Sequence, residues 1–257
     1  DLSGKQLQSY RGGSVAYVFQ DPMGTLEPTI RVGTLLAQVI RLHHKVSRAE
    51  SKQRALELLR RVHIKDAETI ARRYPHELSG GLAQRVAIAR AIAGEPALLI
   101  ADEPTTALDA SIRLGVLDLL RELQRETGMA LLVVSHDWDV VDYLCDRAIV
   151  MYAGQVVESG TVDELLDRTA HPYTQALLAC RPKSDSDRAA PLPSVPGHVA
   201  APGTWATGCR FADRCPLAQP ECRTASIPLI PVGDGQESRC LFAADLVAEL
   251  EPTAVTR

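Results

Sequence analysis

Two short apolar runs with one helical stretch between them constrain the fold of this chain more than any other feature. The runs are PALLIAD at 96–102 and ALLVVSH at 130–136, and residues 110–126 have helical spacing. A strand, a helix and a strand at this spacing are typical of a parallel βαβ unit, so we expect an α/β fold. Polar groups at the carboxyl ends of such strands meet at one edge of the sheet. Here they are Asp102, Glu103 and His136.

The composition excludes several other classes of protein. The chain has 257 residues, of which 46% are hydrophobic and 23% are charged, as in an ordinary globular protein. Its net charge of -4 comes without a basic block, so we expect no nucleic-acid partner. No apolar stretch reaches the roughly 20 residues that a membrane helix needs. The chain opens at Asp1 in the middle of a pattern, and we expect it to be part of a longer polypeptide.

Further elements are expected on both sides of the βαβ unit. The run SVAYVFQ at 14–20 predicts a strand that ends at Gln20. Helical spacing at 30–64 and an alanine-rich helix after Ser79-Gly80-Gly81 predict a helical insert over about 21–94.

The second half of the chain changes character near residue 168. A hairpin that turns at Ala153-Gly154 and a short helix complete a first domain at 1–168. Residues 169–257 contain a Pro-rich connector and then four of the six cysteines. We therefore expect them to form an appended module.

The carboxylate pair at the end of the 96–102 strand predicts chemistry at a phosphate. Asp102 is suited to hold Mg²⁺, through water, because Mg²⁺ keeps several waters and takes few protein carboxylates. Glu103 is suited to polarise an attacking water as a general base. Taken alone, the pair is equally well explained as the polar end of a strand before a turn.

Three other sites fit the same chemistry. The glycines of Ser79-Gly80-Gly81 leave N–H groups accessible to an anion at a helix N-terminus, although an ordinary N-cap has the same sequence. His136 is suited to donate to a terminal phosphate, or it is a histidine at the end of a core strand. Gln20 is suited to bind Mg²⁺ and the attacking water, or it is an amide at a strand edge.

The order of these motifs resembles the nucleotide-binding subunit of ABC transporters, a P-loop NTPase fold with a parallel-sheet core and a helical subdomain. FQDP is similar to the Q-loop, LSGGLAQR to the signature motif, LLIADEP to the magnesium and catalytic-base strand, TALD to the D-loop and VVSHD to the switch histidine. The resemblance implies an ATPase in which two such domains sandwich Mg²⁺ and ATP.

The resemblance also assigns roles to residues. Gln20, Glu103 and His136 would take part in hydrolysis, and Asp102 with Gln20 would hold Mg²⁺. Ser79, Gly80 and Gly81 of one domain would contact the γ-phosphate held by the other, with Gln84 in the same motif. Asp109 would communicate between the two sites.

A narrower resemblance covers the appended module. FQDPMGTLEPTIRVG, GTVDELLDRTAHPYTQALLAC and the cysteine segment are similar to the oligopeptide/dipeptide importer ATPases with their C-terminal extension. This implies peptide import, or nickel import in some members. The partners would be two transmembrane permease subunits and an extracytoplasmic peptide-binding protein, with this chain peripheral at the cytoplasmic face of the membrane.

Two positions depart from the family pattern. Leu82 stands where the signature motif often has Gln, and Gln84 with Arg85 follows the subfamily. No G-x-x-x-x-G-K-[ST] phosphate loop is present in the 257 residues, because SGK at 3–5 lacks the preceding glycine and the following hydroxyl. We expect this loop in an N-terminal part that precedes Asp1.

Two alternatives stay open. Chromosome-maintenance ATPases share the signature serine and the carboxylate strand, but they need long heptad insertions that this chain does not contain. In the second alternative, the chain is a non-catalytic or regulatory half of an unequal ABC pair. Glu103 and His136 are both present, which argues against a degenerate site.

The cysteine segment predicts a metal site. Cys209, Cys215, Cys222 and Cys240 are spaced C-x5-C-x6-C-x17-C in a segment with little apolar material to fold around. The spacing leaves Zn²⁺ and a [4Fe-4S] cluster open, since it lacks the close pairs of zinc sites and matches neither common ferredoxin pattern. The resemblance to the importer tail favours the iron–sulfur cluster, in a structural role.

Overall fold

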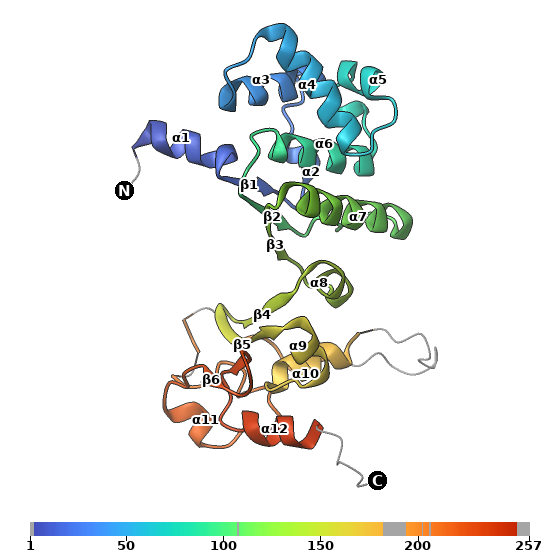
Figure 1. Cartoon of the computed structure of the whole chain (residues 1–257). Coiled ribbons are helices and arrows are strands. Elements are labelled where there is room, and N and C mark those ends of the chain that lie inside the picture. The colour runs from blue at the N-terminus through green and yellow to red at the C-terminus, as the bar shows by residue number, and fades with distance from the viewer. Residues whose placement is uncertain (1–2, 107, 182–193, 202, 206, 251–257) are drawn as a thin grey trace. The chain divides into compact units, whose positions relative to one another are not determined.

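The computed structural model describes residues 3–106, 108–181, 194–201, 203–205 and 207–250. The chain forms two compact units, Asp1–Leu144 and Cys145–Arg257 (Figure 1). The division lies before the predicted hairpin, whereas the boundary expected from the sequence follows it, at residue 168.

A parallel sheet forms the centre of the first unit. Its strands are β1 (Val15–Val18), β2 (Leu98–Asp102) and β3 (Ala130–Val134), in the order β1-β2-β3. Helix α7 (Ala110–Thr127) connects β2 to β3 and ends at Gly128, whose φ of 68° is the left-handed value that glycine adopts readily. The predicted βαβ unit is therefore confirmed.

Helices α3 to α6 of the first unit gather on one side of these strands. Figure 1 shows α6 (Gly80–Ile92) between the strands and the group formed by α3 (Val32–His43), α4 (Arg48–Arg61) and α5 (Ala67–Arg72). The remaining elements of this unit are α1 (Gly4–Gly13), α2 (Pro22–Thr25), a 3-10 turn at Pro75–Glu77 and α8 (Trp138–Leu144).

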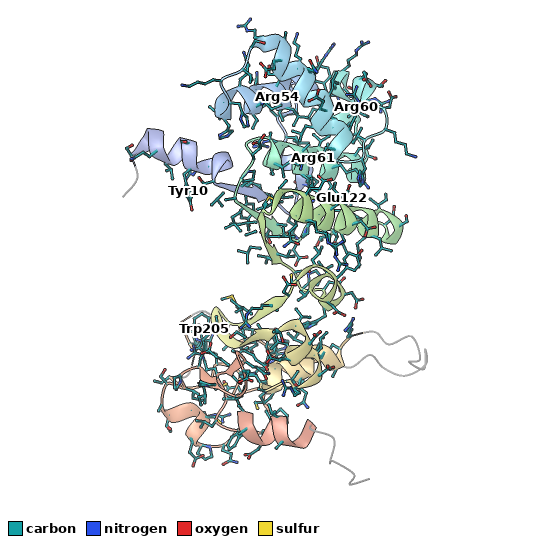
Figure 2. All side chains as sticks on the ribbon, in the orientation of Figure 1. Tyr10, Arg54, Arg60, Arg61, Glu122 and Trp205 are labelled. Carbon is teal, nitrogen blue, oxygen red and sulfur yellow. The ribbon has the colours of Figure 1, made fainter. Side chains whose placement is uncertain are left out.

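Helix α4 begins after an N-cap serine. The Ser47 hydroxyl accepts the N–H of Glu50 at 3.1 Å. Its surface carries charged side chains, including Arg54 and Arg60 (Figure 2). Arg54 pairs with Glu50 one turn earlier, so this is an ordinary charged surface.

The two faces of the parallel sheet differ in burial. Leu99 and Ala101 of β2 are fully buried. On the opposite face, Tyr17, Leu132 and Val134 are 39%, 50% and 48% exposed. The helices therefore cover one face of the sheet and leave apolar side chains of the other accessible.

An antiparallel sheet forms the second unit, in the order β4-β5-β7-β6. The predicted hairpin of β4 (Arg147–Tyr152) and β5 (Gln155–Thr161) turns at Ala153 and Gly154, with φ values of 48° and 75°. Strands β6 (Ile230–Pro231) and β7 (Glu237–Ser238) extend the sheet. The helices are α9 (Val162–Asp167), α10 (Pro172–Ala179), α11 (Glu221–Thr224) and α12 (Ala243–Leu250).

A buried carboxylate connects distant segments of the second unit. Glu158 of β5 has no exposed surface, and its Oε1 accepts the N–H of Ala170 at 2.6 Å and the Nε2–H of Gln236 at 3.0 Å. Burial raises the pKa of Glu158, although these donors oppose the shift. The contacts explain why the hairpin packs with the C-terminal segment. Across both units, no described helix is long and apolar enough to cross a bilayer.

Candidate functional site

Glu103 occupies a strained backbone position directly after β2. Its φ is 48°, in the left-handed region, which costs a residue with a Cβ about 1–2 kcal/mol. The Glu103 N–H donates to the Val134 carbonyl at 2.8 Å, so the turn is fixed to the end of β3. Strained conformations of this kind concentrate at functional sites. The turn directs the Glu103 side chain along the carboxyl edge of the sheet.

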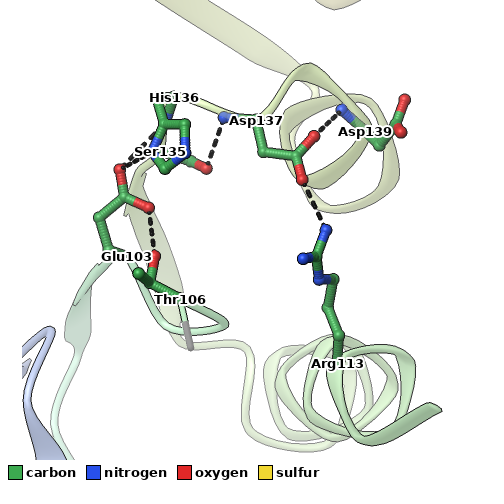
Figure 3. Close-up of polar contacts among 7 residues, drawn as sticks. All are labelled: Glu103, Thr106, Arg113, Ser135, His136, Asp137 and Asp139. Atoms are coloured by element: carbon green, nitrogen blue, oxygen red, sulfur yellow. Dashed lines mark hydrogen bonds and ion pairs between the residues drawn. The ribbon is translucent and has the colours of Figure 1, made fainter. Parts of the chain in front are cut away.

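His136 and Glu103 meet at that edge, as the parallel strands predict. His136 Nδ1 lies 2.6 Å from Glu103 Oε1, and the backbone N–H of His136 donates to the same oxygen at 3.1 Å (Figure 3). Thr106 Oγ1 donates to Glu103 Oε2 at 2.7 Å. The imidazole is 78% exposed and the carboxylate 17%, so the histidine covers the acid and faces outward.

These donors determine the protonation of Glu103. Burial would raise its pKa, but the hydrogen bonds from His136 and Thr106 outweigh burial, and the pKa is lowered. The side chain is therefore a carboxylate at neutral pH. Each of its oxygens accepts about two hydrogen bonds, and among the described residues Oε1 accepts two and Oε2 accepts one. One acceptor position remains on Oε2, beside Thr106.

Asp102 and Gln20 lie at the same edge. Val18 of β1 pairs with Ala101 of β2, so Asp102 and Gln20, which follow these residues by one and two positions, both lie at the carboxyl end of the paired strands. Asp102 Oδ2 accepts a hydrogen bond from the Tyr17 hydroxyl at 2.7 Å. Sequence reasoning missed Tyr17, although its parity in β1 places it on the same face as Asp102.

The signature segment starts helix α6. Ser79 is the N-cap, with φ -69° and ψ 158°, yet its side chain makes no capping hydrogen bond within the described chain. The hydroxyl of Ser79 and the first N–H groups of a 13-residue helix are thus available to an anion. Ser79 and Gly80 are exposed, whereas Gly81 is buried against α7.

Gln84 has a different environment from the rest of this motif. It is 2% exposed, and its Nε2 has no hydrogen-bond partner among the described residues. The side chain lies in the core of the helical group, so its position does not favour contact with a ligand.

Asp109 starts helix α7 in the same way that Ser79 starts α6. It is the exposed N-cap of α7, and its carboxylate makes no capping hydrogen bond in the part of the chain that the structure describes. The carboxylate is therefore accessible from outside the unit. Arg113, one turn later, pairs with Asp137 at 2.9 Å (Figure 3), a contact that the sequence analysis did not identify.

Four of the six cysteines of the second unit line one pocket. Cys209, Cys215, Cys222 and Cys240 share it with His171 and Phe211. Cys209 and Cys222 are also joined through the backbone, because the Cys209 N–H donates to the Cys222 carbonyl at 2.7 Å.

Burial and backbone donors act in opposite directions on these thiols. Burial raises the pKa of Cys209 and that of Cys215, and it raises the pKa of Cys240 to about 11. In each case the backbone N–H two residues later, at Phe211, Leu217 or Phe242, opposes the rise. Such N–H groups favour thiolates. Among the described residues, however, no group of three or more His, Cys, Asp or Glu side chains is positioned to hold a metal ion. The predicted cluster is thus not confirmed by the geometry.

Comparisons with known proteins place the chain in a family. The family models "ABC transporter" and "Oligopeptide/dipeptide transporter, C-terminal region" match residues 1–106 and 157–222. A putative peptide import ATP-binding protein of Brucella abortus (strain 2308) is 46% identical over 239 residues, which are 93% of this chain and 71% of that protein. The chain belongs to the ATP-binding subunits of ABC transporters. A probable D,D-dipeptide transport ATP-binding protein of Escherichia coli (strain K12) is 45% identical over 92% of this chain and 71% of its own length.

Solved ABC structures have the same fold. A dimeric ATP-binding cassette in a post-hydrolysis state, bound to ADP and phosphate, is 32% identical with a TM-score of 0.57, covering 63% of this chain and 68% of that chain. A cassette of an ABC transporter complex from Clostridium perfringens is 33% identical with a TM-score of 0.56, covering 64% and 63%. The ABC-type fold and the ATPase class predicted from the sequence are therefore confirmed.

Proposed function

We propose that this chain is part of one of two paired ABC cassettes, which together hydrolyse ATP and thereby drive the import of short peptides. The observation that carries the proposal is the likeness to a peptide import ATP-binding protein along 93% of the chain. The match to the oligopeptide/dipeptide transporter C-terminal region supports it. Because the named relatives concern peptides, peptides are favoured over nickel as the transported substrate.

The proposed assembly has the parts that such an importer requires. A second ABC cassette completes the nucleotide sites, two permease subunits form the path through the membrane, and an extracytoplasmic protein delivers the peptide. This chain is peripheral at the cytoplasmic face. The proposed domain division, 1–168 for the cassette and 169–257 for the extension, follows the sequence motifs rather than the compact units.

Glu103 is the proposed general base of hydrolysis. Its carboxylate is ionised, and the remaining acceptor position on Oε2 takes a proton from the attacking water. His136 fixes Oε1 through two hydrogen bonds. With Nδ1–H directed at Glu103, the exposed Nε2 donates to a phosphate oxygen when the ring is protonated.

Asp102 and Gln20 are the proposed magnesium ligands. The oxygen donors of a carboxylate and an amide suit this hard cation. When bound, Mg²⁺ neutralises charge on the phosphates. The Tyr17 hydroxyl orients the Asp102 carboxylate by donating to Oδ2, and among the described residues no hydrogen bond is made to the other oxygen.

The signature residues are proposed to serve the opposite cassette. Ser79, Gly80 and Gly81 contact the γ-phosphate bound there, because Ser79 and the α6 N-terminus have unused donors. Asp109 is proposed to communicate between the two sites. We assign Gln84 to the core of α6 rather than to this contact.

The cysteine pocket is proposed to hold a metal group in a structural role. The donors are Cys209, Cys215, Cys222 and Cys240, and a [4Fe-4S] cluster is favoured over Zn²⁺ as the occupant. Support comes from the shared pocket and from the N–H groups directed at three of the sulfurs. Binding requires the thiols to lose their protons and to move closer together.

The catalytic proposal is tested by Glu103→Gln in the assembled transporter. ATP hydrolysis and peptide uptake are measured together, with Glu126→Gln at the exposed C-terminal end of α7 as the control. Loss of a general base is expected to lower turnover by about 10²- to 10⁴-fold, while ATP binding is retained. Near-normal hydrolysis in Glu103→Gln would instead favour the non-catalytic half of an unequal pair.

A further inference from the structure

Helix α7 is tied to the turn that carries His136 by one ion pair. Arg113 Nη1 donates to Asp137 Oδ2 at 2.9 Å (Figure 3). Arg113 lies in the first turn of α7, where its N–H donates to the carbonyl of Asp109 at 2.8 Å. Asp137 directly follows His136. The pair thus connects the Asp109 end of α7 with the His136 turn.

Asp137 also organises the turn itself. Its N–H donates to Ser135 Oγ at 3.0 Å, and its Oδ1 accepts the N–H of Asp139 at 2.9 Å at the start of α8. One carboxylate oxygen is therefore used within the turn and the other toward Arg113. A change at Arg113 alters the orientation of this carboxylate without removing the local hydrogen bonds.

Packing does not hold the ring of His136. The side chain is 78% exposed, so its position depends on hydrogen bonds. Glu103 holds it on one side, at Nδ1 and at the backbone N–H. On the other side, the backbone leads directly into the Asp137 turn.

The exposure of the ion pair argues against a mainly stabilising role. The side chain of Arg113 is 43% exposed and that of Asp137 is 29% exposed, and pairs this accessible add little to the free energy of unfolding. The Nε of Arg113 is buried without a partner among the described residues, which is an unfavourable arrangement. The guanidinium is thus better suited to positioning than to stabilisation.

We propose that Arg113 is a positioning residue for His136, acting through Asp137. It couples the Asp109 turn, directed at the opposite cassette, to the histidine that faces the phosphate in its own site. The proposal rests on the ATPase function proposed above. A displacement of Asp109 is transmitted along one helical turn and one ion pair to the His136 turn.

The test compares, in the assembled transporter, variants of the two ion pairs that α7 makes near its opposite ends. Arg113→Gln removes the charge, Asp137→Asn keeps the acceptor for Asp139, and Arg113→Lys restores a cation. The control is Arg61→Gln, which breaks a pair of similar exposure, Arg61 with Glu126, at the far end of the helix.

Three results are expected. Arg113→Gln and Asp137→Asn lower kcat for ATP by roughly 3- to 30-fold with little change in KM. Their double variant is no worse than either alone, because both remove one interaction. Hydrogen exchange of residues 135–139 becomes faster in these variants, while Arg61→Gln behaves as wild type and Arg113→Lys recovers most of the activity.

Other outcomes overturn the proposal. The first is that Arg61→Gln lowers kcat as much as Arg113→Gln does. The second is that Arg113→Lys is as impaired as Arg113→Gln. The third is that hydrogen exchange of residues 135–139 does not change in the variants. Failure of the proposed function is recognised separately, since Glu103→Gln would then leave hydrolysis intact.

Discussion

Gly81 and Ile112 touch so closely that a side chain on the glycine has no room. A Cβ on Gly81 would lie 2.6 Å from Ile112 Cγ2, whereas the nearest described atom to a Cβ on the preceding Gly80 is in Leu108, at 3.9 Å. The first turn of α6 therefore packs directly on the first turn of α7. The second signature glycine serves this packing as well as any anion contact.

This difference predicts opposite behaviour of the two glycines. Gly81→Ala is expected to lower the free energy of unfolding by roughly 1–3 kcal/mol, the usual cost of overpacking. Gly80→Ala is expected to be neutral or slightly stabilising, because alanine favours helices by up to about 1 kcal/mol. Urea denaturation of the two variants measures the difference. Equal effects would contradict the packing explanation.

The buried Glu158 predicts a pH-dependent effect on stability. Burial raises the pKa of Glu158 above its ordinary value. Its contribution to the free energy of unfolding is therefore full below the ordinary pKa and is lost as pH rises through the raised pKa of the folded state. Glu158→Gln keeps an acceptor for the Ala170 N–H and removes the buried charge. The melting temperature of Glu158→Gln relative to wild type is expected to increase from pH 5 to pH 8.

Glu164 provides a control of opposite sign for that experiment. It is the N3 residue of the capping box that Thr161 starts at α9, and the hydrogen bond from the Thr161 N–H, at 2.8 Å, is the main reason that the pKa of Glu164 is lowered. Its contribution is present above the ordinary pKa and is lost as pH falls through the lowered folded value. Glu164→Gln should therefore destabilise the protein most at neutral pH. A Glu158→Gln effect that is independent of pH would show that the carboxyl is not the titrating group.

The patterns of apolar residues typical of strands and of helices were sufficient to predict the elements around the site. The parallel register of β2 and β3 follows from the βαβ spacing, and it brings Glu103 to His136. The left-handed φ of Glu103 was not predictable, because side-chain patterns carry no information on a single strained dihedral. The burial of Gln84 was predictable, since Ala87 and Ile88, three and four residues later, are apolar and share its helix face.

Long-range pairing explains the differences at the unit boundary. Residues of β5 pair with Glu237 and Ser238 of β7, about eighty positions along the chain. No local pattern records such a pairing, so the hairpin was expected to belong to the first domain. The Arg113–Asp137 pair was missed for a related reason, because two exposed charges in separate elements have no periodic signal.

The absence of a phosphate-loop sequence leads to a prediction for the 257-residue chain alone. No G-x-x-x-x-G-K-[ST] sequence is present in it, so the lysine that holds the β- and γ-phosphates is not supplied. We expect weak ATP binding and no turnover above background, measured by calorimetry and phosphate release. Robust hydrolysis by this chain would show that another group replaces that lysine.

The cysteine pocket leads to the last prediction, which concerns its occupant. The pKa values of Cys209, Cys215 and Cys240 are raised by burial, so these thiols are protonated at neutral pH without metal. Binding must therefore release protons and weaken as pH falls. Anaerobically purified protein is expected to contain iron and acid-labile sulfide in the ratio of a [4Fe-4S] cluster. Cys222→Ser should lose both, whereas Cys180→Ser, outside the pocket, should keep them. Stoichiometric zinc without sulfide would reject the cluster, and protein without any metal would reject the site.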